Sequence, residues 1–563
     1  MVKKLFSFLS KEITGIHEAA YLLAFFTILS QILALIRDKL LAFNFGAGTS
    51  LDIYYASFRI PDLIFVSIGS VVSVSVLLPF ITDAYANSKE QGRKLVNSIF
   101  SVFFISLVII SVLAFIFADP LLKLALPGIF KNYSDKFDLL VNMTRILLLS
   151  PIFLGISNFF SNITQMHRRF MVYAISPLIY NLGIILGIIF LYPVFGLYGL
   201  ALGVVFGAFG HMVIQLPFML GRGIFPRFTT DLDWKSVKKI VLISLPRTLT
   251  LSSSQLASFF LVSLASIMTS GGISIFSLAL NLQSVPLTII GVSYSSAIFP
   301  SLSKYFVNGE NDKFIDKIVE SSRHIIFWSI PITVLFVVLR AQIVRTIYGA
   351  GAFDWVDTRL TAATLAIFVI SVTAQSLILL FVRASYARGK TFIPLSINIF
   401  SSLTIALLGY IFLKLYKVYP VFNYFLDELF KVSDLHNSGT HILVLPLAYT
   451  IGTLINLVLY WYICEKDYKG FTYRVLPVFF QCFAGSVIMG YVTFISLRFF
   501  NMFFPLTKLW GVFLQGFCAG IVGITALIIV LRLLQNKELK EVWETLHHKI
   551  WKAKVIIPGQ ENL

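Results

Sequence analysis

The sequence predicts an all-α polytopic membrane protein with about 14 transmembrane helices. Hydrophobic residues make up 57% of the 563-residue chain and charged residues only 13%, whereas soluble domains average about 45–50% and about 25%. Apolar stretches of about 20 residues, long enough to cross a bilayer as a helix, recur along the chain between short breaks. These observations exclude soluble enzymes, secreted disulfide scaffolds, coiled coils and disordered chains.

The predicted spans follow one another with few long interruptions. The boundary between the fifth and sixth depends on Tyr192-Pro193 and the nearby glycines. A long insertion over 417–440 separates the eleventh span from the twelfth. The fourteen stretches lie near residues 19–44, 52–83, 92–118, 137–162, 170–192, 195–219, 236–268, 272–302, 316–345, 358–386, 391–416, 441–463, 474–498 and 509–534.

The formal net charge of +18 reflects 45 Lys and Arg against 27 Asp and Glu. Most basic residues occur in turns between apolar stretches, on one predicted side of the membrane. This bias places both termini in the cytoplasm. No basic stripe with base-stacking aromatic residues stands out, so we do not expect nucleic acid as a partner.

An internal repeat organises the spans. Three proline-containing landmarks recur at offsets of 217 to 225 residues, which predicts two parallel six-helix repeats, an N-lobe and a C-lobe, around a central cavity. Two extra C-terminal helices lie outside the repeat. The matched prolines are Pro61 with Pro286, Pro79 with Pro300, and Pro177 with Pro394.

Six segments follow from these patterns. The two ends are predicted amphipathic helices on the membrane surface, because apolar residues alternate with lysines at helical spacing. The predicted segments are an interfacial N-terminus (1–18), the N-lobe (19–220), a cytoplasmic linker (221–235), the C-lobe (236–463), two extra spans (464–535) and a cytoplasmic tail (536–563).

Charged residues inside predicted spans are candidates for function, because a charge in the bilayer usually faces a cavity or a partner. Arg37 and Asp38 lie late in the first span, Asp52 opens the second, and Arg59 follows seven residues later on the same helix face. Two guanidinium groups with nearby carboxylates suit a bulky anion such as a diphosphate. The alternative is a structural ion pair, Arg37–Asp52 or Arg59–Asp62.

Other polar residues have structural interpretations. Asn181 follows Pro177 by four residues, so its side chain is expected to bond a backbone group that the proline leaves free. No catalytic triad, phosphate-binding loop or metal-spaced cluster is visible. We therefore expect no enzyme activity, no metal site and no cofactor.

Four stretches of the first two spans resemble the N-terminal signature of the MurJ (MviN) lipid II flippases. This family belongs to the multidrug/oligosaccharidyl-lipid/polysaccharide (MOP) exporter superfamily. The four stretches are Ile36 to Asp38, Phe45 to Gly48, Asp52, and Tyr55 to Leu63. Two later stretches, Phe299 to Ser303 and Tyr386 to Pro394, resemble second-lobe landmarks of the same family.

The resemblance implies a function. It is the translocation of an undecaprenyl-diphosphate-linked peptidoglycan precursor from the inner to the outer leaflet by alternating access. Membrane potential or an ion gradient would drive it, in the bacterial cytoplasmic membrane, in a monomer, with the lipid-linked substrate and the bilayer as partners. The alternative is a related exporter of another polyprenyl-linked glycan, or of a small cation by antiport.

The resemblance also assigns candidate cavity residues. Arg37, Asp38, Asp52 and Arg59 match family positions, and Arg388 lies in a second-lobe landmark. Three departures from the family pattern occur: members usually carry an arginine where this chain has Gln31, a basic residue where it has Phe65 or Val66, and a cavity arginine where it has Asn281 or Gln283. Gln31 and Asn281 are added to the candidates.

Overall fold

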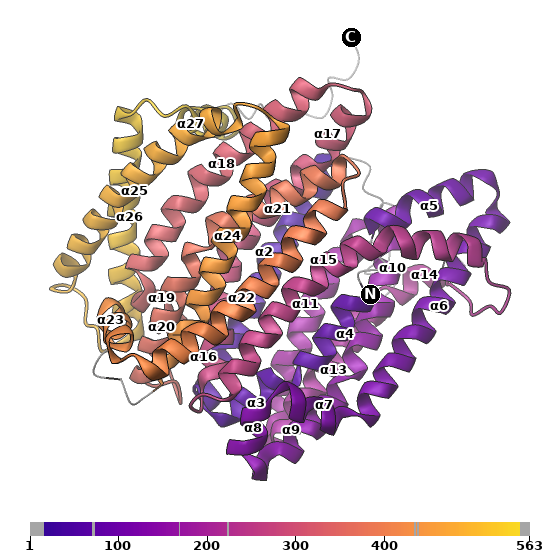
Figure 1. The fold of residues 1–563 in the computed structure, drawn as a ribbon, viewed down its shortest axis with the longest axis horizontal. Helices are drawn as coiled ribbons and strands as arrows, with labels where there is room; N and C mark the ends of the chain where they lie inside the picture. Colours follow the sequence, from indigo (N-terminus) through magenta and orange to yellow (C-terminus); the bar gives the residue numbers. More distant parts are fainter. Residues whose placement is uncertain are drawn as a thin grey trace. The chain divides into compact units, whose positions relative to one another are not determined.

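The structure, a computed structural model, describes residues 16–69, 74–167, 169–221, 224–432, 435 and 439–551. Within these ranges every regular element is a helix (Figure 1), as the composition predicts. By its contacts the chain divides into two compact units. The first comprises residues 1–285, 347–368 and 390–456, and the second comprises 286–346, 369–389 and 457–563. The lobe boundaries predicted from the repeat stay a prediction.

Eleven of the described helical segments are long and apolar enough to cross a membrane, and a bent helix pair makes a possible twelfth. They agree with twelve predicted spans to within a few residues. The predicted spans 19–44 and 52–83 correspond to α2 (Ile16–Phe45) and to the series α3 (Thr49–Ser57), α4 (Arg59–Gly69) and α5 (Val74–Asn87). A polytopic helical membrane protein is therefore confirmed, and the count of fourteen stays a prediction.

The remaining α-helices follow in chain order, with two π-helical segments, η1 (Gly187–Leu191) and η2 (Leu287–Val292), and a 3-10 helix, η4 (Thr440–Leu443), between them. In the first half they are α6 (Lys89–Ile116), α7 (Ala118–Ala125), α8 (Pro127–Asn132), α9 (Ser134–Leu147), α10 (Leu149–Met166), α11 (Phe170–Leu186), α12 (Tyr192–Phe195), α13 (Leu197–Val213), α14 (Leu216–Gly221), α15 (Trp234–Ser266) and α16 (Gly272–Pro286). In the second half they are α17 (Ser293–Val307), α18 (Asn311–Val338), α19 (Arg340–Ile347), α20 (Trp355–Ile370), α21 (Val372–Ala387), α22 (Phe392–Val418), α23 (Pro420–Phe430), α24 (Val444–Asp467), α25 (Phe471–Phe500), α26 (Leu509–Leu533) and α27 (Lys537–Trp551).

In the first unit, α11 packs closely against α13. A Cβ atom added to Gly183 would lie 2.3 Å from the Cα of Gly207, and one added to Gly187 would lie 2.6 Å from the Cα of Gly203. Small residues let helix backbones approach in a membrane, where van der Waals packing replaces the hydrophobic drive. Because α11 also packs on α2, this contact fixes the helix that carries Arg37.

The linker before α15 is bonded to α6 within the same unit. The backbone N–H groups of Thr229 and Asp233 donate to the hydroxyls of Ser101 and Ser98, at 3.0 and 3.1 Å. The Asp233 carboxylate then caps α15 by accepting from the Ser236 N–H. These bonds to Ser236 hold the pKa of the Asp233 carboxyl below its usual value.

The second unit contains the C-terminal helices. Helix α18 packs on α25, and α25 packs on α26. The predicted amphipathic tail is helical as α27, where the carboxylate of Glu538 forms an ion pair with Arg323 of α18 at 2.7 Å. The predicted N-terminal helix over 1–18 lies almost wholly outside the described residues.

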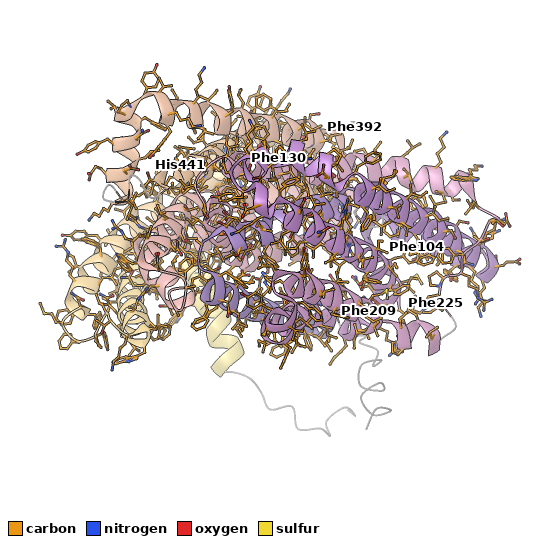
Figure 2. All side chains as sticks on the ribbon, turned by 90° about the horizontal axis from the view of Figure 1, so that it is seen from below. Phe104, Phe130, Phe209, Phe225, Phe392 and His441 are labelled. Atoms are coloured by element: carbon orange, nitrogen blue, oxygen red, sulfur yellow. The ribbon has the colours of Figure 1, made fainter. Side chains whose placement is uncertain are left out.

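Large apolar side chains project from many helices. The side chains of Phe209 and Phe392, both labelled in Figure 2, are 45% and 70% exposed. A water-soluble protein rarely exposes extensive apolar surface. The exposed side chains therefore suit a hydrocarbon environment.

Candidate functional site

Arg37 and Asp38 form an ion pair near the end of α2. The distance from Arg37 Nη2 to Asp38 Oδ1 is 2.8 Å, and Arg37 Nε donates to the same oxygen at 2.9 Å. The side chains are 20% and 2% exposed. A buried charge needs such a partner, because an unpaired one is costly in a membrane. The alternative Arg37–Asp52 pair is wrong, since Arg37 pairs with its sequence neighbour instead.

This ion pair is bonded to two other helices. Arg37 Nη1 donates to Asn181 Oδ1 of α11 at 3.0 Å, and Asp38 Oδ2 accepts from Asn281 Nδ2 of α16 at 2.9 Å. Asn181 Nδ2 also donates to the carbonyl oxygen of Pro177 at 3.1 Å. This is not the predicted bond, because the backbone group that a proline leaves free is the carbonyl four residues earlier, here that of Tyr173. The cluster thus brings together three of the predicted candidates and joins α2, α11 and α16.

Asp52 lies in a second polar contact, between α3 and the start of α16. Its two carboxylate oxygens accept from the backbone N–H groups of Gly271 and Ser274, both at 2.7 Å, and from the Ser274 hydroxyl at 2.6 Å. A carboxylate suits a helix N-terminus because free N–H groups and the helix dipole favour negative charge there. Asp52 therefore holds α3 against α16 rather than pointing free into a cavity.

The contacts around Asp52 join positions at the offset of the predicted repeat. Thr49 and Ser270, whose hydroxyls are 2.9 Å apart, are separated by 221 residues, and Asp52 and Ser274 by 222. These separations lie within the range of offsets between the matched prolines of the predicted repeat. The layout of the two repeats stays a prediction.

Arg59 and Tyr55 form a third group on α3 and α4. Arg59 Nη2 donates to the hydroxyl of Ser277 at 3.2 Å. The Tyr55 hydroxyl and Arg59 Nε are buried and have no hydrogen-bond partner among the described residues. Tyr55 lies within electrostatic range of the guanidinium groups of both Arg37 and Arg59. The Arg59–Asp62 ion pair of the alternative interpretation stays a prediction.

These groups can bind an anion. A buried hydrogen-bond donor without a partner destabilises the protein. A ligand whose oxygens accept a hydrogen bond from that donor removes this cost when it binds. Arg59 Nε and the Tyr55 hydroxyl supply two such donors, and Arg37 supplies a third by exchanging its bond to Asp38. Tyr55 was not among the predicted candidates, although its position one turn before Arg59 places it on the same helix face.

The structure places the other two candidates elsewhere. Gln31 lies on α2 seven residues before Asp38, on the same face, and is half-buried. Arg388 belongs to the second unit, where its Nη1 lies 2.5 Å from Asp467 Oδ2 and 2.9 Å from the Tyr468 hydroxyl. Its guanidinium also covers the Tyr468 ring at 5.2 Å.

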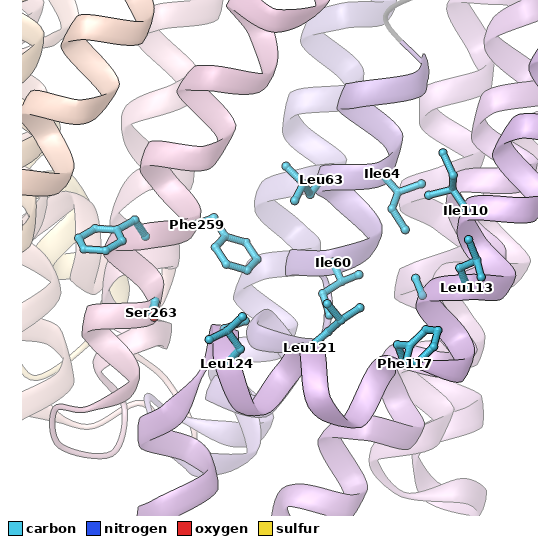
Figure 3. Close-up of a pocket in the computed structure, with 13 residues that line it drawn as sticks. Ile60, Leu63, Ile64, Ile110, Leu113, Phe117, Leu121, Leu124, Phe259 and Ser263 are labelled. Atoms are coloured by element: carbon cyan, nitrogen blue, oxygen red, sulfur yellow. The ribbon is translucent and has the colours of Figure 1, made fainter.

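A concave surface of different character lies beside the site. It is a groove of about 630 Å³ between α4, α6, α7 and α15, which begins one residue from Arg59 (Figure 3). Its lining includes Ile60, Leu63, Phe117 and Phe259, and the only polar side chain among the lining residues is that of Ser263. The groove suits hydrocarbon and not a charged group. No cluster of three or more metal-binding side chains occurs in the part of the chain that the structure describes.

Comparison with known proteins identifies the family. Residues 41–422 match the model of the family described as lipid II flippase MurJ. The chain belongs to the MurJ lipid II flippase family.

Curated members of the MurJ family align along two thirds or more of the chain. A probable lipid II flippase MurJ of Rickettsia prowazekii is 27% identical over 69% of this chain and 76% of its own length. The lipid II flippase MurJ of Burkholderia cenocepacia is 24% identical over 69% and 77%. A probable lipid II flippase MurJ of Buchnera aphidicola subsp. Baizongia pistaciae is 25% identical over 89% and 96%.

Solved structures show the same fold. A lipid II flippase MurJ in an inward closed conformation superposes with a TM-score of 0.72 at 20% identity, covering 92% of this chain and all of that one. An inward-facing multidrug resistance MATE family transporter of the MOP superfamily gives a TM-score of 0.62 at 15% identity, covering 78% and 95%. The predicted MurJ and MOP-type architecture is therefore confirmed.

Proposed function

We propose that this MurJ family member is a lipid II flippase, which moves the undecaprenyl-diphosphate-linked peptidoglycan precursor from the inner to the outer leaflet. The family match across residues 41–422 carries the proposal. The donor groups around Arg37 support it, because they suit the anionic part of such a cargo. The protein acts by transport rather than by catalysis.

The diphosphate of the cargo binds at Arg37, Arg59 and Tyr55. An arginine fork donates two parallel hydrogen bonds to a phosphate, which a lysine does not. Arg59 Nε and the Tyr55 hydroxyl are buried donors with no described partner, so they gain most from acceptor oxygens. The apolar groove that starts at Ile60 lies where hydrocarbon of the same lipid can be accommodated.

Binding is coupled to opening through Asp38. Because Asp38 accepts from both Arg37 and Asn281, a diphosphate that takes Arg37 leaves Asp38 without its cation. The contact between α2 and α16 then weakens. The Asp52 bonds to the start of α16 must break as well if α3 and α16 separate on the outer side.

The energies of these steps are comparable with the driving force. A hydrogen bond to a charged group contributes about 1.5–3 kcal/mol. Moving one elementary charge through 100 mV supplies about 2.3 kcal/mol. Each elementary charge moved through the membrane potential therefore offsets about one such bond, and cargo binding offsets the others. We place the protein in the bacterial cytoplasmic membrane, as a monomer with both termini in the cytoplasm.

Complementation tests the proposal. The gene is expressed in a bacterium whose own lipid II flippase is depleted, and inverted vesicles are assayed for translocation of lipid II. We expect growth and translocation with the unchanged protein, and loss of both with Arg37→Ala, because the cargo loses its arginine fork. Membrane content of each variant is measured by immunoblot.

The matched control is Arg145→Ala. Arg145 donates to the carbonyl oxygen of Phe115 from an exposed position, so its loss should leave translocation unchanged. Failure of the unchanged protein to translocate lipid II would refute the proposed cargo. Full activity of Arg37→Ala would refute the binding role of the Arg37 cluster.

A further inference from the structure

The turn between α2 and α3 is also held by the start of α20 and by the loop that precedes it. The N–H of Ala352 donates to the carbonyl oxygen of Phe43 at 2.8 Å. The N–H of Ala47 donates to Asp357 Oδ2 at 2.9 Å. Residues 43–48 and 347–368 belong to the same compact unit. The contact therefore joins two segments about 310 residues apart in sequence.

The two backbones meet too closely for side chains between them. Gly46 has a φ of +60°, and a Cβ added there would lie 2.5 Å from the carbonyl oxygen of Ala352. Gly351 has a φ of +66°, and its Cβ would lie 2.3 Å from the carbonyl oxygen of Phe43. Only glycine fits both the conformation and the space. The close contact between the turn and the loop therefore depends on glycine at both positions.

Two carboxylates tie the turn and α3 to other segments of the chain. Asp52, which follows the turn, accepts from the N–H groups of Gly271 and Ser274. Asp357, which lies in α20, accepts from the N–H of Ala47 within the turn. The start of α16 and the start of α20 are therefore both bonded to the segment that contains the turn and α3. Charge-assisted bonds of this kind are stronger than neutral ones.

We propose that Asp357 is a positioning residue for transport, which together with Asp52 latches the outer ends of α2 and α3 closed. The proposal rests on the alternating-access function proposed above, and on the predicted orientation of these ends toward the outside. In the cycle, the Asp357 bond must break before the outer side opens. Asp357 touches no cargo and acts through the position of the turn.

A disulfide reports closure of these ends. The hydroxyls of Thr49 and Ser270 are 2.9 Å apart and exposed, so Thr49→Cys with Ser270→Cys forms a disulfide when the segments are together. A protease site placed in the 221–235 linker separates the two cysteines after lysis. The three native cysteines, Cys464, Cys482 and Cys518, all lie in the C-terminal fragment. A Thr49→Cys single variant measures background.

The full-length protein is tested in membranes with Asp357→Asn and Asp357→Ala in this cysteine background. We expect the initial cross-linking rate to fall about tenfold in Asp357→Ala, which corresponds to about 1.4 kcal/mol, and by a smaller factor in Asp357→Asn. Asparagine keeps the shape of aspartate and one acceptor oxygen. The Asp357→Asn variant therefore provides the test if Asp357→Ala does not accumulate in the membrane. Lipid II translocation is measured in parallel.

The matched control is Asp119→Asn. Asp119 lies on α7, is about 41% exposed and pairs with Lys123 at 2.8 Å, so its variant should cross-link like the unchanged background. Equal cross-linking in Asp357→Asn, Asp357→Ala and Asp119→Asn would overturn the latch. Cross-linking needs no cargo, so it tests the latch even if the unchanged protein fails to translocate lipid II.

Discussion

At the scale of the residue, the central feature is a charged pair made of sequence neighbours. Arg37 and Asp38 neutralise each other within one turn of α2, and each still reaches another helix through an asparagine. The cost of burying the arginine is thereby offset locally. An incoming phosphate can bind the Arg37 guanidinium by displacing the Asp38 carboxylate from it.

Tyr55 gives the sharpest residue-scale prediction. Replacing it by phenylalanine removes one buried donor and keeps the ring, so the apparent affinity for lipid II should fall about two- to tenfold, the effect of losing about 0.5–1.5 kcal/mol. The concentration dependence of translocation in vesicles measures it. Tyr462→Phe, at a side chain that is 67% exposed, is the control. An unchanged affinity in Tyr55→Phe would exclude the hydroxyl from cargo binding.

The sequence singles out the charged residues of the candidate site, but it does not predict their hydrogen-bond partners. Arg37, Asp38, Asp52 and Arg59 stand out because charges are rare in apolar stretches. Their partners Asn181, Asn281 and Ser274 come from 144 to 243 residues away, and helix packing, not sequence spacing, brings them together. The Arg37–Asp52 alternative failed for the same reason, because a helix N-terminus competes better for Asp52.

At the scale of the element, the contact between α11 and α13 sets the position of the site. Glycines on both helices let the backbones touch, so Asn181 stays within reach of Arg37. The break between the fifth and sixth predicted spans was predictable from glycine: the helix continues through Tyr192-Pro193 and ends before Gly196, which has a φ of +58°. The helix over Pro420–Phe430 within the long insertion was not predicted, because its amphipathic pattern is short.

Enlarging one glycine of this contact should destabilise the protein. In Gly203→Leu the new Cβ would lie 2.6 Å from the Cα of Gly187, and overpacking of this kind costs about 1–3 kcal/mol. We expect a lower midpoint of thermal unfolding for the purified protein in detergent. Gly221→Ala, whose Cβ meets nothing within 4 Å, should unfold like the unchanged protein. Equal midpoints for Gly203→Leu would show that the helices can separate freely.

At the scale of the whole molecule, the amino-acid composition is enough to predict the fold class. The spacing of the apolar stretches predicts where the membrane-spanning helices lie. The agreement of twelve predicted spans with described helices reflects the strict length that a bilayer imposes. The arrangement of the two repeats depends on contacts between distant segments, which a single sequence does not contain. Offsets between matched prolines indicate the repeat without fixing its geometry.

The orientation of the chain is a testable whole-molecule prediction. A single cysteine is introduced at Asp119 or at Arg227 and labelled with a membrane-impermeant thiol reagent in intact cells. The two positions should differ, because the excess of Lys and Arg predicts that the 221–235 linker, which contains Arg227, lies in the cytoplasm. Asp119→Cys should react and Arg227→Cys should react only after the membrane is opened. The reverse pattern would invert the topology and place the Asp357 latch on the cytoplasmic side.

The pairing of Arg37 with Asp38 has a consequence for the electrical balance of the cycle. An empty pair carries no net charge, whereas the same pair with a bound diphosphate is net negative. In the proposed cycle, membrane potential would therefore act on the movement of the loaded pair and leave the return of the empty pair almost unaffected. The potential would favour one direction of cargo movement without slowing the return of the empty protein.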